Sequence, residues 1–229
     1  MSKKILIVGG TGFLGYHLAK KCRKKNWKVT SISSSKPKKK RYLKNIEYII
    51  ADITNREQLK KKLIKKFDYI VNFGGYVDHT NKAKTFKSHF YGCKNLVDIF
   101  LKKNIKLFLQ IGSCVEYGKA PSPQKEIYIT DVNKVNSKYG KAKLLATNYL
   151  LEKNKQYKFP CTILRPYLVY GPKQDFNRFI PITIKGCFLN SKFPSSSGKQ
   201  FRDFLYIDDF IDAVFKCLKS NKVIGEIFN

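Results

Sequence analysis

The chain has 229 residues, with 46 lysines and arginines against 16 aspartates and glutamates, which gives a formal net charge of +30. A hydrophobic content of 43% excludes a disordered basic tail, because such tails lack the apolar residues that form a core. No apolar run approaches the roughly 18–20 residues that span a bilayer. The apolar run after residues 1–4 is also shorter than the roughly 7–15-residue core of a signal peptide. We therefore expect a soluble, cytoplasmic protein built around one large domain.

The positive charge comes almost entirely from lysine, with 40 lysines against 6 arginines. The lysine clusters are spread through the first half of the chain, in expected loops and on solvent faces of helices. Base-reading and bidentate phosphate contacts favour arginine instead. We therefore interpret the lysines as an ordinary solvated surface and expect neither a nucleic-acid nor a membrane partner. A basic nucleic-acid-binding surface is the alternative interpretation of the charge.

Apolar, often β-branched runs alternate with segments of helical periodicity along the whole chain. The runs predict strands over residues 4–8, 28–33, 46–51, 69–73, 106–111, 161–164 and 225–229. Helices are predicted over residues 12–25, 56–66, 85–103, 208–219 and, after a cap at Asn136 or Ser137, to about residue 153. This alternation indicates an α/β fold, a Rossmann-like doubly wound parallel sheet with helices on both faces.

A glycine-rich turn joins the first predicted strand to the first predicted helix. Glycines at positions 9, 12 and 15 permit a tight turn, close approach of a pyrophosphate to the backbone, and close packing of helix on strand. The N–H groups and the dipole of the helix would face the phosphates. The sequence therefore predicts a dinucleotide site formed by Gly9, Thr11, Gly12, Phe13, Leu14 and Gly15.

The end of the second predicted strand bears on which dinucleotide is expected. Such sites usually carry an acidic residue there, which holds the ribose 2′-hydroxyl. Here the position is Ser33, and Lys36 begins a lysine-rich segment that runs to Arg41. Hydroxyls and cations suit a 2′-phosphate, so the sequence favours NADP over NAD. Asp52 and Ile53 follow the third strand, where Asp52 would meet the adenine edge or, equally, cap the next helix.

Tyr139 and Lys143 lie four residues apart on a predicted helix, so their side chains share one face. A free phenol ionises near pH 10, about three units too high for a base at neutrality, and an ammonium group nearby favours the phenolate. Ser113, at the end of the fifth strand, is placed to hold a substrate oxygen while Tyr139 moves its proton. We therefore predict that Ser113, Tyr139 and Lys143 are catalytic.

Cysteines and histidines show no pattern that indicates a metal site. The six cysteines form no Cys-x-x-Cys pair, and several lie beside apolar residues, as expected for buried, reduced thiols. His17, His79 and His89 have no metal-ligand spacing among themselves or with the cysteines.

Taken in chain order, these segments resemble the extended short-chain dehydrogenase/reductases, specifically the NAD-dependent epimerase/dehydratase family. The resemblance covers the whole chain. It includes the glycine turn, Asp52, the Tyr139/Lys143 pair, and residues 72–75, 113–118, 164–172 and 202–209. The resemblance implies that the cofactor also meets Phe73, Gly74, Gly75, Tyr139 and Lys143.

The resemblance further implies a nucleotide-sugar substrate whose diphosphate meets Arg202. Residues 1–170 would form an NAD(P)-binding Rossmann domain, and residues 171–229 a partial substrate-binding region whose helix and strand return to it. Family members continue well past the last predicted strand, so we expect a small, apparently truncated substrate lobe. Members often pair through two helices, which implies a homodimer. Candidate substrate contacts are Ser113, Asn177, Arg178, Phe179 and Ser195 to Ser197.

Departures from the family pattern narrow the expected reaction. The 4,6-dehydratases carry Asp-Glu where this chain has Cys114 and Val115, which are no acid/base pair at neutral pH. Glu116 would point to the opposite side of a continuing strand. Leu168 and His89 stand where many members have asparagine. We therefore expect an NAD(P)-dependent sugar-nucleotide 4-epimerase or 4-keto reductase in surface-polysaccharide biosynthesis. The alternative is a catalytically silent NADP-binding module or a nucleic-acid-binding module.

Overall fold

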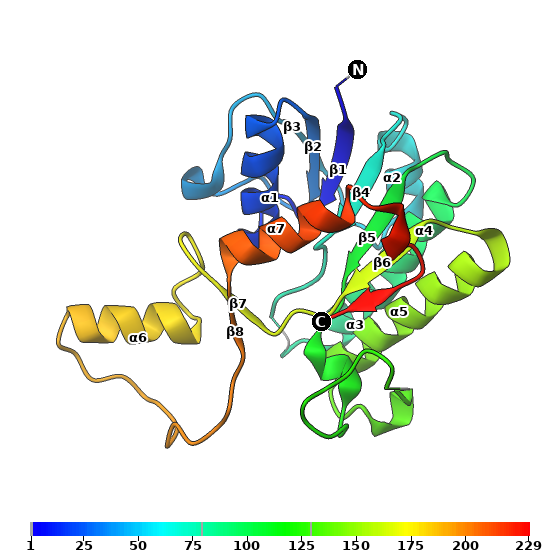
Figure 1. Ribbon diagram of the computed structural model, residues 1–229. Helices are drawn as coiled ribbons and strands as arrows, with labels where there is room; N and C mark the ends of the chain where they lie inside the picture. The colour runs from blue at the N-terminus through cyan, green and yellow to red at the C-terminus, as the bar shows by residue number, and fades with distance from the viewer. Residues whose placement is uncertain (1, 79, 129) are drawn as a thin grey trace.

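The computed structural model describes residues 2–78, 80–128 and 130–229, so His79 lies outside the described residues. Seven parallel strands form one sheet in the order β3-β2-β1-β4-β5-β6-β9 (Figure 1). They are β1 (Lys4–Val8), β2 (Lys28–Ser33), β3 (Glu47–Ile50), β4 (Tyr69–Asn72), β5 (Leu107–Ile111), β6 (Cys161–Leu164) and β9 (Ile227–Phe228). This sheet confirms the predicted Rossmann-like α/β fold. The strand order reverses beside β1, where ligands bind in such sheets.

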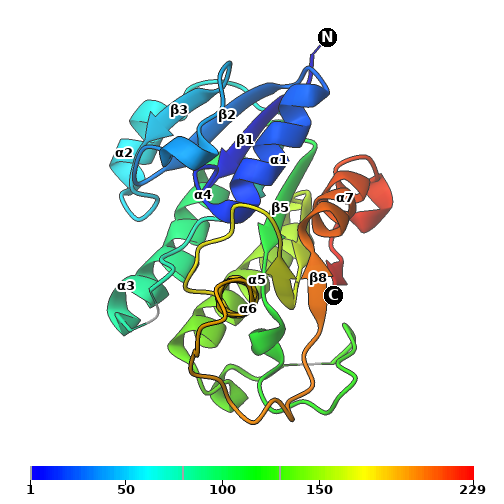
Figure 2. The ribbon, with the colours of Figure 1, turned by 90° about the vertical axis from the view of Figure 1, so that its left-hand side faces the viewer.

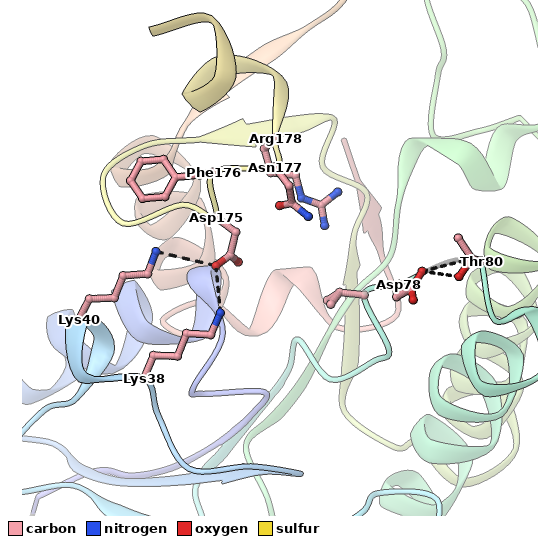
Figure 3. A pocket seen from close by; sticks show the side chains of 9 residues that line it. Lys38, Lys40, Asp78, Thr80, Asp175, Phe176, Asn177 and Arg178 are labelled. Carbon is pink, nitrogen blue, oxygen red and sulfur yellow. Dashed lines mark hydrogen bonds and ion pairs between the residues drawn. The ribbon is translucent and has the colours of Figure 1, made fainter. Parts of the chain in front are cut away.

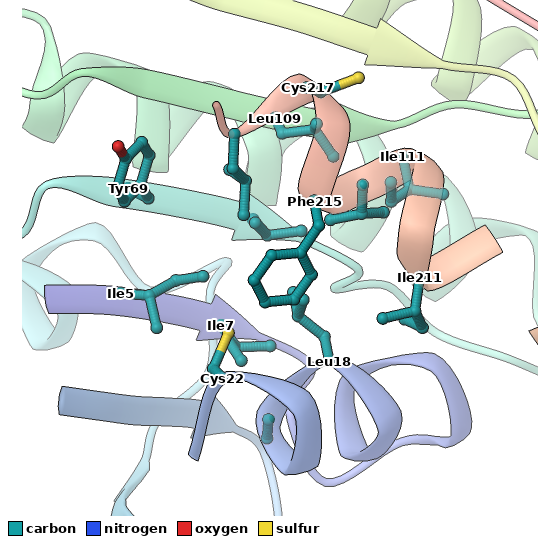
Figure 4. Packing of buried hydrophobic residues seen from close by; sticks show 14 of the residues in the cluster. Ile5, Ile7, Leu18, Cys22, Tyr69, Leu109, Ile111, Ile211, Phe215 and Cys217 are labelled. Atoms are coloured by element: carbon teal, nitrogen blue, oxygen red, sulfur yellow. The ribbon is translucent and has the colours of Figure 1, made fainter. Parts of the chain in front are cut away.

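Helices cover both faces of the sheet, because the strands β1, β2, β4, β5 and β6 bury side chains on both sides. One face carries α1 (Phe13–Lys24) and α7 (Ile207–Cys217), whose apolar sides pack on Ile5, Ile7 and Leu109 (Figure 4). The other face carries α2 (Arg56–Lys62), α4 (Gly92–Phe100) and α5 (Lys138–Tyr157). The two apolar layers hold the carboxyl ends of the strands at one edge, where the glycine turn also lies.

Two predicted helices differ from the helices in the structure. The segment predicted as one helix over 85–103 consists of α3 (Lys82–Phe86), a π-helical turn (Lys87–Tyr91) and α4. The helix predicted over 56–66 ends at Lys62, because the chain turns there to bury Leu63 and Phe67 in the core. Ser137, one of the two candidate caps, begins α5 and accepts a hydrogen bond from the Gly140 N–H.

Three elements near the carboxyl edge were not predicted from the sequence. Strands β7 (Leu168–Tyr170) and β8 (Phe204–Tyr206) pair in parallel as a separate two-stranded sheet. Helix α6 (Phe179–Phe188) projects away from the main sheet, and Gly186 is its buried residue (Figures 1 and 2). Their short or uniformly apolar sequences give no clear period. Among the described residues, no helix is both long and apolar enough to cross a membrane.

Candidate active site

The glycine turn adopts the conformation that its sequence predicts. Gly9 has a φ of +74°, a region that favours glycine, and its carbonyl accepts a hydrogen bond from the Gly12 N–H at 3.0 Å. A side chain at Gly15 would collide with the Gly9 carbonyl and lie 2.6 Å from the Gly10 Cα. Helix α1 can therefore approach β1 closely only with glycine at position 15.

The same turn fits the diphosphate of a dinucleotide. Gly12 is the N-cap position of helix α1, and no side chain of the described part of the molecule caps its first turn. The amide groups and positive dipole end of α1 thus face the carboxyl edge of the sheet, as an anion-binding site requires. Next to the turn, the Thr11 N–H donates to Ser33 Oγ at 3.3 Å, which ties the turn to the end of β2.

A cleft of about 350 Å³ brings distant predicted residues together. Its walls combine the glycine turn, the end of β4, the end of β5 and the first turns of α5. The predicted residues that line it are Gly9, Gly12, Phe13, Leu14, Gly15, Phe73, Gly75, Ser113, Tyr139, Lys143 and Arg178. The cleft therefore joins the predicted cofactor turn to all three predicted catalytic residues.

Tyr139 stands in this cleft between Ser113 and His89. Burial is the largest influence and raises the pKa of Tyr139 to about 12, although a hydrogen bond with Ser113 and the Arg178 charge act to lower it. The ring of His89 meets the ring of Tyr139 edge-on, with centroids 4.9 Å apart. These contacts orient a phenol that stays protonated at neutral pH, so Tyr139 is a proton donor in this state of the site.

The ammonium group of Lys143 donates to the backbone of β5 and lies above the Tyr139 ring. Its Nζ donates to the Ile111 carbonyl at 2.6 Å and lies 5.8 Å from the centre of the Tyr139 ring. Burial lowers the pKa of Lys143 to about 8, although the charge of Glu116 raises it. The expected lowering of the phenol pKa by this ammonium group therefore gains no support from the geometry.

Glu116 belongs to a buried network and not to the cleft. The strand ends before Glu116, because residues Cys114–Tyr117 form a 3₁₀ turn capped by Ser113. Glu116 is fully buried. Its Oε1 accepts from the Ser113 N–H at 2.8 Å, and its Oε2 accepts from Thr147 at 2.8 Å and from Arg165 Nε at 2.9 Å. With these partners, the carboxylate holds Ser113 in place and is not available to a substrate.

The residues predicted around the adenosine half lie near one another at the ends of β2, β3 and β4. Ser33 is buried, and its hydroxyl is engaged by the glycine turn. Asp52 is exposed and accepts a hydrogen bond from the Thr54 N–H, whereas the cap of α2 is Asn55, whose side chain accepts from the Gln58 N–H. Ile53 is buried and limits the space at Gly74. Lys36 is exposed.

A second cavity of about 790 Å³ adjoins the cleft and shares Val77 and Arg178 with it. Lys38, Lys40 and Asp175 form one side, and Asp78 and Thr80 form the other (Figure 3). Asn177 lines this cavity, whereas Arg202 lines neither cavity and donates to the Phe201 carbonyl. Of the predicted substrate contacts, Ser113, Asn177 and Arg178 are therefore the ones that face these cavities.

The sequence did not single out Gln174 and Tyr167, and it did not reveal that Arg41, the end of the lysine-rich segment, pairs with Asp175. Gln174 and Tyr167 line the cleft, and Arg41 meets Asp175 beside the second cavity. Arg41 and Asp175 lie 134 positions apart in the chain, so no local spacing could reveal the pair. The sequence feature that could have located Gln174 and Asp175 is the Gly-Pro turn at 171–172, which places the following residues near the end of β7.

Comparison with known proteins agrees with this geometry. The model of the "NAD dependent epimerase/dehydratase family" matches residues 5–229. The chain is 28% identical over 248 residues to UDP-N-acetyl-alpha-D-glucosaminuronate decarboxylase of Bacillus cytotoxicus, covering 100% of this chain and 75% of the relative. It is 27% identical over 256 residues to dTDP-D-glucose 4,6-dehydratase of Dictyostelium discoideum, covering 99% of this chain. The chain spans 58% of that relative, which is less than two thirds of its length.

Solved structures share the fold. UDP-glucose 4-epimerase of Thermotoga maritima, with UDP-glucose, superposes with a TM-score of 0.84 at 24% identity, covering 92% of this chain and 71% of that one. The dTDP-glucose 4,6-dehydratase of Bacillus anthracis, in complex with NAD, superposes with a TM-score of 0.86 at 22% identity. The match covers 99% of this chain and 74% of that one. At these identities the likeness shows the architecture alone.

Proposed function

The chain belongs to the NAD dependent epimerase/dehydratase family, and on this premise we propose that it epimerises or reduces a nucleotide-linked sugar with a nicotinamide dinucleotide. The observation that carries the proposal is the cleft in which Ser113 and Tyr139 lie opposite the glycine turn. A silent binding module would have no use for this arrangement. In the proposed division of the chain, residues 1–170 bind the dinucleotide and residues 171–229 contribute to the substrate side.

The proposed mechanism gives each residue one task. A nicotinamide dinucleotide held in this cleft would supply the hydride transfer to or from a sugar carbon. The phenol of Tyr139, whose pKa burial raises to about 12, would donate a proton to the sugar oxygen, and the phenolate left behind would take that proton back in the reverse direction. Ser113 orders that oxygen through its hydroxyl, and Glu116 fixes Ser113 through its backbone N–H. Lys143, which lines the same cleft close to the Tyr139 ring, would hold the nicotinamide ribose.

Dehydration is disfavoured for this chain, although two named relatives are dehydratases. Cys114 is half-buried, and burial raises the pKa of its thiol, so it is a poor base at neutral pH. Val115 carries no titratable group, and Glu116 is held by Arg165 and Thr147. These three positions therefore offer no free acid/base pair beside Tyr139. The expected place in surface-polysaccharide biosynthesis and the expected homodimer stay predictions.

The test of catalysis is Tyr139→Phe, with Tyr157→Phe as its control on the same helix, where Tyr157 is exposed. We expect Tyr139→Phe to lower turnover of UDP- and dTDP-sugars by about 10²–10⁴-fold, the range for general acid/base groups. Binding of the dinucleotide, measured by fluorescence titration, should change little in either variant. Full turnover by Tyr139→Phe would contradict the assignment of Tyr139 as the acid/base residue. If the wild-type chain turns over none of these sugars, the alternative of a silent binding module is favoured.

The choice between NAD and NADP needs a separate measurement. The preference for NADP rested on Ser33 and the cations after it. In the structure, Lys38, Lys40 and Arg41 lie within 4 Å of the Asp175 carboxylate, which already neutralises part of their charge. We therefore expect NADH to bind more tightly than NADPH in a direct fluorescence titration. Tighter binding of NADPH would contradict this expectation and support the preference for NADP that Ser33 and the following cations suggest.

A further inference from the structure

Helix α6 carries apolar side chains around its whole circumference. Lys185 is the one charged residue among its ten, and Gly186 is the one that is buried. A helix that is apolar all round is ordinarily enclosed by other elements. Helix α6 instead projects away from the main sheet (Figures 1 and 2). A single chain therefore leaves much of this apolar helix uncovered.

The inner side of α6 packs against its own chain. A side chain at Gly186 would lie 2.2 Å from the ring of Phe193, so the loop after α6 closes tightly on this residue. Two turns earlier, the ring of Phe179 stacks on Phe204 of β8, with the ring centroids 6.1 Å apart. Residues seven positions apart lie on the same side of a helix. These contacts fix the orientation of α6 and turn its opposite side outward.

The outward side of α6 carries a stripe formed by Pro181, Ile184 and Phe188, which we call the outer stripe. These residues stand at positions i, i+3 and i+7, so their side chains follow one another along the helix. Ile184 is 63% exposed and Phe188 is 87% exposed. Apolar anchors at this spacing are the pattern by which a helix docks on another apolar surface. The outer stripe therefore has the form of a docking surface.

The segment around the outer stripe exposes more apolar surface than a monomer ordinarily does. Eight of the seventeen large hydrophobic side chains exposed in the described part of the chain lie within residues 176–206. At about 200 Å² for a fully exposed side chain, their exposed fractions amount to about 1,000 Å² per chain. The largest apolar patch of a typical monomer measures about 300–600 Å². Two copies that each covered about three fifths of this surface would bury about 1,200 Å², the lower limit for a specific, stable interface.

We propose that the outer stripe is an interface with a second copy of this chain, in which two α6 helices pack antiparallel about a two-fold axis. Such an axis places the same patch of both copies in contact, and an apolar stripe on a short helix fits its own antiparallel copy. The ten-residue helix is about 15 Å long, which exceeds the Debye length of about 8 Å. Two chains of net charge +30 can therefore meet through their projecting helices while salt screens much of their repulsion.

The interface lies outside the candidate active site. Neither Ile184 nor Phe188 lines the cleft or the second cavity. Pairing through α6 would therefore leave both cavities accessible to ligands. The inference goes beyond the proposed function and does not depend on it, so the two can fail separately.

An anionic lipid surface fits the outer stripe less well than a second copy does. Helix α6 contains one lysine, and it follows β7 near the carboxyl edge of the sheet. The lysine clusters at 60–66 and 101–106 precede β4 and β5, so they lie at the opposite edge. An anionic surface would attract those clusters and turn α6 away from itself.

Sedimentation velocity over a range of protein concentrations measures the pairing. We expect the 26.6 kDa wild-type chain to form dimers as its concentration rises. The double variant Ile184→Ser/Phe188→Ser should raise the Kd of the dimer at least about 100-fold, because two buried apolar side chains are lost from each copy. The matched control Ile64→Ser/Tyr157→Ser removes side chains that are 78% and 60% exposed elsewhere, and it should leave the Kd unchanged. Circular dichroism checks that both variants stay folded.

Two outcomes of this experiment would overturn the proposal. One is a wild-type chain that stays monomeric at every concentration. The other is a dimer that the double variant keeps, because the copies would then pair through another face, such as that of α4 and α5.

Salt and lipid vesicles test the nature of the contact. Because the chains repel each other, raising NaCl from about 0.05 M to about 0.5 M should lower the Kd of the dimer. A Kd that rises with salt would show pairing through ion pairs and contradict an apolar interface. Vesicles of phosphatidylglycerol should not bind through α6. Vesicle binding that the double variant loses would assign the outer stripe to a lipid surface and overturn the proposal.

A cross-linking experiment tests the two-fold arrangement. Ile184 lies near the middle of α6, so the axis would bring its two copies together. The exposed Cys187 is first replaced by serine. Under mild oxidation, Cys187→Ser/Ile184→Cys should form a disulfide-linked dimer, which requires Cα atoms within about 7 Å. The control Cys187→Ser/Ile64→Cys should stay monomeric on a denaturing gel. If the Ile184→Cys chain forms dimers but no cross-link, the antiparallel arrangement is wrong.

Discussion

The ammonium group of Lys143 lies in the protein interior, 4% exposed, and donates to the Ile111 carbonyl. Burial disfavours a charged amine, which is why the pKa of Lys143 falls from 10.5 to about 8. A group whose pKa is lower in the folded state destabilises the protein below that pKa. The penalty disappears as the pH rises from about 8 toward 10.5. Lys143 thus occupies its position at a cost to stability, as expected of a functional residue.

We predict that Lys143→Met stabilises the apo protein at pH 7. Removal of the buried charge should outweigh the lost hydrogen bond to Ile111, for a net gain of about 1–2 kcal/mol in the free energy of unfolding. Urea unfolding of both proteins at pH 7 and pH 10 measures the difference, which should shrink at pH 10 as the wild-type amine loses its proton. Lys141→Met, on the same helix, is the control. A less stable Lys143→Met protein at pH 7 would contradict the prediction.

At the scale of the elements, strands β1, β2 and β6 match their predicted limits, because each is a short buried run bounded by turn or polar residues. The region over 85–103 was predicted as one regular helix, but it contains a π-helical turn at Lys87–Tyr91. The wide turn places His89 against Tyr139 and within 3.1 Å of the Tyr76 carbonyl. The spacing of apolar residues cannot reveal that a helical turn holds one extra residue, because the wide turn depends on its contact with α5.

Element positions also explain why Glu116 could not be assigned correctly from sequence. A continuing strand would have pointed its side chain away from Ser113, whereas the 3₁₀ turn bends it back to bond the Ser113 N–H. The turn is stabilised by Arg165 at the end of β6 and Thr147 on α5. Both partners are more than 30 positions away in the chain, so the conformation depends on tertiary contacts.

At the scale of the whole molecule, the topology gathers lysines that are dispersed in the sequence. In a parallel sheet, all strands begin at one edge, where the preceding helices end. The seven segments at this amino edge contain 19 lysines and three carboxylates, a net +16 of the total +30. They are residues 2–4, 24–28, 44–47, 60–68, 101–106, 155–160 and 216–226. The edge opposite the cleft therefore carries more than half of the net charge, which the positions of the lysines along the chain do not reveal.

We predict that this amino edge dominates binding to polyanions. Replacing Lys60, Lys61 and Lys65 by glutamine should lower the salt concentration that elutes the protein from a heparin column, because fewer ion pairs form. The matched control replaces Lys82, Lys84 and Lys87, which follow β4 at the carboxyl edge. Both triple variants lose three charges. An equal shift for the two would show that net charge alone, and not its placement, governs retention.

The sequence by itself determined the alternation of strands and helices, the glycine turn before α1, and the shared face of Tyr139 and Lys143. These features depend on residues within one or two turns of each other, so periodicity and spacing contain them. Only the tertiary structure decided which groups meet: Glu116 with Arg165, Lys143 with Ile111, and Arg41 with Asp175. Burial and long-range contact set their charge states and roles, because the free energy of a buried charge depends on its partners and not on its neighbours in the chain.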